Sequence, residues 1–274
     1  MAASVESPGA LANAHASRVF SWVVKRWGTL ETFRRLAKAG IPIMKPALQE
    51  KCRKIVAGAE SLGLYDVMFK KEGMTPAEAK VEFLNAIGGF GAMADQMAGY
   101  QITQHDFAVD AACLIFAHTI VDAAVAEHCR VISLVSPLHL ERLVGRKTVA
   151  LEEVRESGYE QLVRGKVEEY LDALDRRSLM EKVGILHDLC RPNSDFARRT
   201  GCVYDQERLQ KLDRIRHDIV HGREVATPLP EGDDDLKFLH GVCNYFFLLV
   251  NQQYGVKLDP DSLGMALAPG AGIK

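Results

Sequence analysis

The amino-acid sequence predicts an all-α protein, with an N-terminal helical region followed by a helical bundle. Helix start and stop signals recur along the 274 residues, and apolar residues repeat at helical spacing. Strand-forming runs are scarce. Residues 130–135 form a short β-branched run, but the end of a helix explains this run equally well. We therefore expect helices to make up the whole fold.

The composition is that of an ordinary globular protein. Hydrophobic residues make up 47% of the chain and charged residues 26%, which excludes wholesale disorder. The formal net charge of -2 gives no overall attraction to nucleic acid, so any contact with RNA would need a local basic surface. The six cysteines form no C-x-x-C pair, which favours reduced, buried thiols over a zinc or redox site.

The sequence predicts a cytoplasmic protein. Residues 1–17 lack the basic and apolar regions of a secretion signal. The apolar run over 245–250 is far shorter than the ~20 residues that cross a bilayer. We therefore expect neither secretion nor a membrane segment.

The first half of the chain predicts a helical region of unknown role. Small and polar residues over 1–16 indicate a disordered lead-in, and the helical region follows over 17–100. Its helices are expected over 18–27, after Thr29 and over 47–61, with Gly40, Pro42 and Pro46 between the last two. Methionines and alanines over 79–98 fit core packing, or alternatively a surface for a protein partner.

Two local patterns stand out in this half. Thr75, Pro76 and Glu78 form a helix start in which threonine caps, proline takes the first position and glutamate reaches back. The glycines at positions 88, 89, 91 and 99 mark a soft domain boundary. They form no phosphate-binding loop, because no lysine followed by serine or threonine comes after them.

The second half predicts a separate helical domain over 104–255, with a tail over 256–274. Its helices are expected over 105–131, 137–144, 149–174, 178–189, 205–221 and from Asp233 or Asp234 to Gly255. The first of them is rich in alanine and apolar residues, which is typical of a buried core helix.

The helix over 205–221 contains the candidate site. Asp205 can cap it and Gly222 can end it. One face is predicted to be buried, and it consists of Leu209, Leu212, Ile215, Ile219 and Val220. Arg216 falls within this apolar face. Because a guanidinium keeps its charge, such an arginine must either meet a carboxylate or line a cleft that holds an anion.

Two histidines lie next to this arginine. His217 and His221 are one helical turn apart, and imidazoles titrate close to neutral pH. The run from Arg216 to Gly222, RHDIVHG, resembles the Arg-x4-6-His motif of the HEPN superfamily, whose helical domains occur in many RNA-cleaving toxins and defence proteins. The likeness extends to the layout of the helices over 104–255, whereas residues 1–99 resemble nothing that we can name.

The resemblance implies an endoribonuclease that needs no metal or cofactor. His221 would act as the general base on a ribose 2′-hydroxyl, and the attack on phosphorus would leave a 2′,3′-cyclic phosphate. Arg216 would stabilise the charge on the phosphorane oxygens, and His217 would hold the phosphate or orient His221. The resemblance also implies RNA as substrate, a homodimer, and an antitoxin or other regulatory protein as partner. Arg214 and Arg223 are candidate contacts to the RNA backbone, although a solvated charged face is the commoner explanation.

Several other interpretations remain open from sequence. Arg216 fits a buried ion pair, and His217 and His221 have the spacing of two zinc ligands in a protease. The His187-Asp188 pair looks like the centre of an HD-type phosphohydrolase, for which His118 or His139 would be the upstream metal ligand. A non-catalytic module that binds nucleotides or dimerises is a further alternative.

Overall fold

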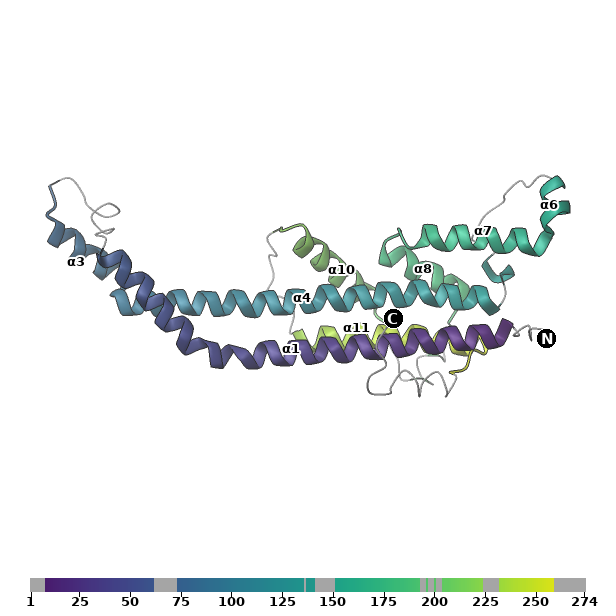
Figure 1. The fold of residues 1–274 in the computed structure, drawn as a ribbon, viewed down its shortest axis with the longest axis horizontal. Coiled ribbons are helices and arrows are strands. Elements are labelled where there is room, and N and C mark those ends of the chain that lie inside the picture. The colour runs from purple at the N-terminus through teal and green to yellow at the C-terminus, as the bar shows by residue number, and fades with distance from the viewer. Residues whose placement is uncertain are drawn as a thin grey trace, which may run out of the picture. The chain divides into compact units, whose positions relative to one another are not determined.

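A computed structural model describes residues 8–61, 73–135, 137–140, 151–192, 196, 200, 204–223 and 232–258 of the chain. Its regular elements are all α-helices, so the predicted all-α class is confirmed (Figure 1). The helices are α1 (Pro8–Ser61), α3 (Pro76–Ile87), α4 (Phe90–Val135), α6 (Leu151–Ser157), α7 (Tyr159–Leu174), α8 (Leu179–Cys190), α10 (Gln206–Val220) and α11 (Gly232–Tyr254).

Helix α1 is continuous over residues 8–61, where the sequence predicted the second part of a disordered lead-in and three separate helices. Residues 1–7 of the predicted lead-in lie outside the described residues. The helix begins at Pro8, because Ala12 and Ala16 are buried and tie the start of the chain to the core. Pro42 and Pro46 lie inside the helix. Both prolines are exposed, and each removes one backbone hydrogen bond from the helix.

The chain divides into two compact units at positions that the sequence did not predict. Unit 1 comprises residues 1–30 and 113–274, and unit 2 comprises residues 31–112. The predicted boundary lay among the glycines over 88–99. Gly88 and Gly89 do separate α3 from α4 with positive φ angles of 67° and 94°, but Gly91 and Gly99 lie within α4. A helical glycine costs only about 1 kcal/mol relative to alanine, which a long helix tolerates.

Unit 2 is held together by a small core and by ion pairs between α1 and α4. The core consists of Cys52, Val56, Ala94 and Ala98, with Leu48, Met93 and Met97 packed against it. Ala94, Ala98, Met93 and Met97 of α4 therefore serve core packing, one of the two predicted roles. Arg34 pairs with Asp110 at 3.1 Å, and Arg53 pairs with Asp95 at 3.7 Å. The predicted capping box of α3 is confirmed. The Thr75 hydroxyl accepts a hydrogen bond from the Glu78 amide, and the Glu78 carboxylate accepts one from the Thr75 amide.

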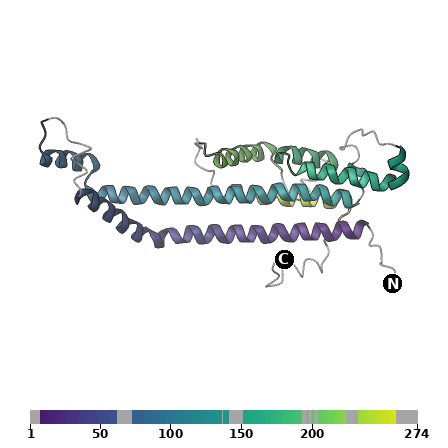
Figure 2. The ribbon, with the colours of Figure 1, turned by 45° about the horizontal axis from the view of Figure 1, so that its top comes forward.

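Unit 1 is built around the second part of α4. His15 of α1 lies 2.7 Å from Glu127 of α4, and Phe20 of α1 packs against Phe247 of α11 with ring centroids 5.1 Å apart. Helices α10, α8 and α7 follow one another along α4 (Figures 1 and 2). Polar pairs join each of these regions to α4: His118–Asp213, Asp122–Lys182 and Arg130–Asp175.

The remaining helices of unit 1 follow the predictions with local differences. The segment expected to be one helix over 149–174 is two helices, α6 and α7, because Gly158 takes a φ of 77° between them. Helix α8 lies within one residue of its predicted bounds, and α11 ends before Gly255, whose φ is 65°. Of the helix expected over 137–144, Pro137 is a turn and residues 138–140 are helical, and residues 141–144 lie outside the described residues.

One described helix is long and apolar enough to cross a membrane by length and composition. It is the Gly91–Val135 portion of α4, and 56% of its most apolar stretch is buried within the protein. A core helix of a soluble protein passes the same test. The five described cysteines are free and buried, and Cys202 lies outside the described residues. Burial raises the pKa of Cys129, Cys190 and Cys243 to about 12, so these three thiols stay protonated at neutral pH.

Candidate functional site

The helix that carries the Arg-His motif forms largely as its sequence predicts. Asp205 caps α10 by accepting a 2.9 Å hydrogen bond from the Arg208 amide. Leu209, Leu212 and Ile215 are buried, which fixes that face of α10 against the core.

The end of α10 differs from the prediction. Ile219 is half-buried and Val220 is 49% exposed, so the apolar face extends beyond the core that covers its first three members. The helix ends at Val220, and His221 is the residue that caps it. Gly222 follows with a φ of 62°, the left-handed backbone in which glycine is favoured.

A cavity of about 610 Å³ lies against α10, between it, α4 and the start of α8. Its lining contains the guanidinium groups of Arg177, Arg214, Arg216 and Arg223 together with the rings of His118 and His217. Asp122, Asp213 and Asp218 also line it. The volume falls in the usual range for ligand sites, about 300–1,000 Å³, and the cations favour an anionic ligand.

Arg216 lines this cavity without an ionic partner among the described residues. Its Nε is buried and has no hydrogen-bond acceptor. A buried donor without a partner costs about 1–3 kcal/mol, and more when the group is charged. Two surroundings were predicted for this arginine, a carboxylate partner or a cleft for an anion. Arg216 makes no ion pair among the described residues, but it lines a cavity and its charge lowers the pKa of Asp213 in the same lining, so features of both are present.

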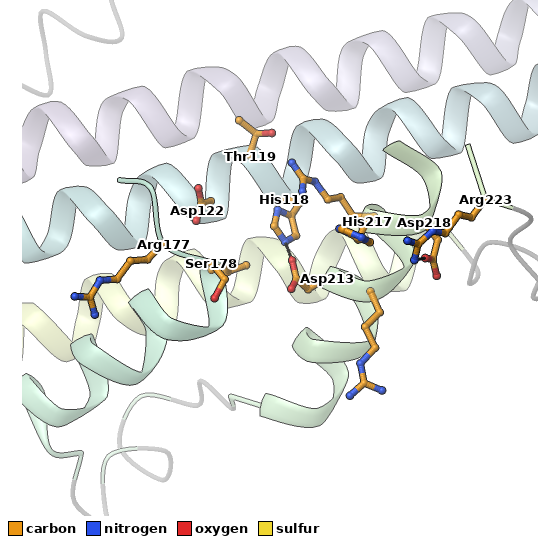
Figure 3. Close-up of a pocket in the computed structure, with 12 residues that line it drawn as sticks. His118, Thr119, Asp122, Arg177, Ser178, Asp213, His217, Asp218 and Arg223 are labelled. Carbon is orange, nitrogen blue, oxygen red and sulfur yellow. Dashed lines mark hydrogen bonds and ion pairs between the residues drawn. The ribbon is translucent and has the colours of Figure 1, made fainter. Parts of the chain in front are cut away.

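Asp213 and His118 form a pair in the wall of the cavity that sequence reasoning did not find. Nε2 of His118 lies 2.6 Å from Oδ1 of Asp213, and the two side chains point toward each other from α4 and α10 (Figure 3). The hydrogen bond from His118 lowers the pKa of Asp213, and the positive charges of Arg216 and His217 lower it further. Asp213 is therefore an ionised carboxylate at neutral pH, surrounded by three cationic or titratable groups.

The two predicted histidines lie together, but only one lines the cavity. The ring centroids of His217 and His221 are 4.3 Å apart, with the ring planes inclined by 55°. His217 is exposed and lines the cavity. His221 is exposed and does not belong to the lining. The structure thus brings Arg216 and His217 to one cavity and places His221 beside them.

Arg214 and Arg223, the predicted backbone contacts, are both exposed and both line the cavity. They differ in their surroundings. A guanidinium nitrogen of Arg223 lies 3.4 Å from Asp218, whereas Arg214 has no ion pair within the part of the chain that the structure describes. Both can therefore contact an anion in the cavity, and Arg214 can do so without first leaving a carboxylate partner among the described residues.

The metal-dependent alternatives find little support in the geometry. The His187 ring lies within an aromatic cluster, with centroids 4.9 Å from Tyr204 and 5.3 Å from Phe246. In the described ranges, no three His, Cys, Asp or Glu side chains are grouped as metal ligands, around either His187 or the His217–His221 pair.

No family model, curated protein or solved structure matches this chain. Its chemistry must therefore be inferred from its own residues. These are an arginine-rich cavity in which Nε of Arg216 has no acceptor among the described residues, an imidazole at its wall and a second imidazole held by a carboxylate.

Proposed function

We propose that this chain is a HEPN-like endoribonuclease that cleaves RNA without a metal ion. The observation that carries the proposal is the buried Nε of Arg216, which has no acceptor and lies in the wall of a cation-rich cavity. A phosphodiester supplies the missing acceptor and the negative charge. His217 adds a second group able to donate to the same phosphate.

In the proposed reaction, His221 takes the proton of a ribose 2′-hydroxyl. The O2′–P bond forms, the P–O5′ bond breaks, and the products end in a 2′,3′-cyclic phosphate and a 5′-hydroxyl. Arg216 donates hydrogen bonds to the non-bridging oxygens, where negative charge gathers in the transition state. His217, whose ring packs on His221, orients the base and contacts the phosphate.

A homodimer is part of the proposal. Val220 and His221 are exposed at the C-terminal end of α10, where an apolar face continues beyond the core. A second copy that covers this end would bury Val220 and bring two His221 rings close to the cavities. The same enzyme would act in the cytoplasm as a toxin or defence protein, restrained by an antitoxin or another regulatory protein.

One observation favours a second candidate function. His221 does not line the cavity, so the site can hold an anion without a base in place. In that case the chain would be a non-catalytic module that binds nucleotides or RNA. Cleavage distinguishes the two functions, because both of them predict binding that depends on Arg216.

The test is single-turnover cleavage of a labelled single-stranded RNA in EDTA, with analysis of the product ends. We expect wild type to cut the RNA and to leave a cyclic phosphate. Arg216→Ala should slow the reaction by about 10²–10³-fold, and His221→Ala by about 10²–10⁴-fold. Arg164→Ala, on the exposed face of α7, is the matched control and should cut at the wild-type rate. Equal rates for all four folded proteins would refute the site.

A further inference from the structure

Cleavage by a 2′-hydroxyl requires a proton donor as well as a base, because the leaving 5′-oxygen must be protonated. Arg216 cannot fill this role, since a guanidinium does not release its proton in proteins. His217 and His221 share one turn of α10. An in-line displacement places the attacking and leaving oxygens on opposite sides of phosphorus, so one helical turn cannot readily serve both oxygens.

The geometry points to His118 as the general acid of the proposed cleavage, with Asp213 as its positioning residue. The inference rests on the proposed ribonuclease function and names a further residue of the same site. His118 comes from α4, whereas His217 comes from α10, so these two rings approach the cavity from different helices (Figure 3).

The surroundings of His118 fit this role. The side chain lines the cavity, yet the residue is only 4% exposed, so a single ring orientation is enforced by packing. Nε2 engages Asp213 at 2.6 Å, which leaves Nδ1 as the nitrogen that can exchange a proton with a ligand. The Asp213 carboxylate holds Nε2 of the ring, so it fixes the direction in which Nδ1 can donate.

The other charged groups of the cavity have different partners or positions. Asp122, one turn further along α4, binds Lys182 through both carboxylate oxygens at 2.9 Å. Arg216 and His217 lie on the α10 side and contribute positive charge near Asp213. Among the imidazoles of the cavity, His118 is the one held by a carboxylate.

The proton balance of the step is complete. As the O2′–P bond forms, His221 takes the hydroxyl proton. As the P–O5′ bond breaks, the electron pair goes to O5′ and His118 gives it a proton. The neutral His118 and the protonated His221 then exchange protons with water, and no oxidant, reductant or metal takes part.

The experiment compares two RNA substrates that differ in one atom. In the first, the leaving atom is the normal 5′-oxygen. In the second it is a bridging 5′-sulfur, and the thiolate leaves without protonation. We expect His118→Gln to slow cleavage of the oxygen substrate by about 10²–10³-fold and that of the sulfur substrate by less than tenfold. His221→Ala should slow both. His15→Gln, which alters another histidine–carboxylate pair of unit 1 outside the cavity, should slow neither.

Asp213→Asn provides the second variant, because a substitution of buried His118 can disturb the fold. It keeps the side-chain size and an oxygen acceptor while it removes the charge, so its defect should also be confined to the oxygen substrate. Equal loss on both substrates, in variants that circular dichroism shows to be fully folded at the assay temperature, would overturn the acid role. If wild type cuts neither substrate, the ribonuclease proposal itself fails, and the acid role with it.

Discussion

Nζ of Lys182 lies 2.9 Å from both carboxylate oxygens of Asp122, and the burial of the two partners is unequal. Lys182 on α8 has a side chain that is 2% exposed, whereas that of Asp122 on α4 is 34% exposed. If Lys182 is removed, water can reach the Asp122 carboxylate without any movement of the chain. Lys182 has no such access to water, so the energetic cost of breaking the pair depends on which partner is lost.

Asp122→Ala should therefore destabilise the protein far more than Lys182→Met. Loss of the carboxylate leaves a buried ammonium without a partner, which costs about 3–5 kcal/mol. Methionine fills the space of the lysine stem and removes the buried charge, so the second change should cost less than about 1.5 kcal/mol. The free energy of unfolding from urea denaturation measures both. Similar losses for the two variants would show that the pair is not as unequal as its burial indicates.

His128 should make the protein less stable in mildly acidic solution. The residue is buried in α4, and desolvation lowers its pKa from 6.5 to about 4. Between these values the unfolded chain binds a proton that the folded chain does not, so stability falls as the pH drops from about 6.5 to about 4. The full difference amounts to about 3 kcal/mol.

The check is the pH dependence of the unfolding free energy in wild type and His128→Phe. Phenylalanine keeps an aromatic ring in the site and cannot titrate, so its stability curve should be flatter over this pH range. Parallel curves for the two proteins would mean that another group causes the acid sensitivity.

Asp213 should also make the protein less stable as the pH falls, but in a lower pH range than His128. The hydrogen bond from His118 lowers the pKa of this carboxyl below its ordinary value of 3.8. The stabilisation is thus fully present above that value and is lost as the pH falls through the folded-state pKa. Asp213→Asn should be less stable than wild type at neutral pH, and the difference should shrink below about pH 4. A deficit that stays constant down to acid unfolding would contradict the assigned hydrogen bond.

Sequence reasoning succeeded where the signals are local. The capping residues Asp205 and Thr75 act within four residues of themselves, and the core positions Leu209, Leu212 and Ile215 follow from helical spacing. It failed where contacts with distant parts of the chain determine whether a side chain is buried. Val220 continues the apolar spacing, but no described core element covers it fully, and its exposure is a tertiary property.

The same reason explains the missed pair in the cavity wall. His118 and Asp213 are 95 residues apart, and nothing in the residues around His118 distinguishes it from an ordinary core histidine. Asp213 lies three and four residues before Arg216 and His217, so helical spacing places it on their face. That spacing alone could have singled out Asp213, but not its partner on α4.

If the chain binds RNA as proposed, Arg214 should contribute more to the affinity than Arg223, and its contribution should appear in the salt dependence of binding. Arg214 has no ion pair among the described residues, whereas Arg223 is already near Asp218 at 3.4 Å. Each phosphate contact on single-stranded RNA contributes about 0.7 to the slope of log affinity against log salt. In a His221→Ala background, which keeps the RNA intact, Arg214→Ala should lower the slope by about that amount. Arg223→Ala should lower the slope less, because the charge of Arg223 is already partly compensated by Asp218, and Arg164→Ala should leave the slope unchanged.

Fluorescence anisotropy of a labelled RNA between about 50 and 200 mM salt measures these slopes. If Arg214→Ala weakens binding equally at every salt concentration, the arginine acts through the shape of the cavity and not through a phosphate.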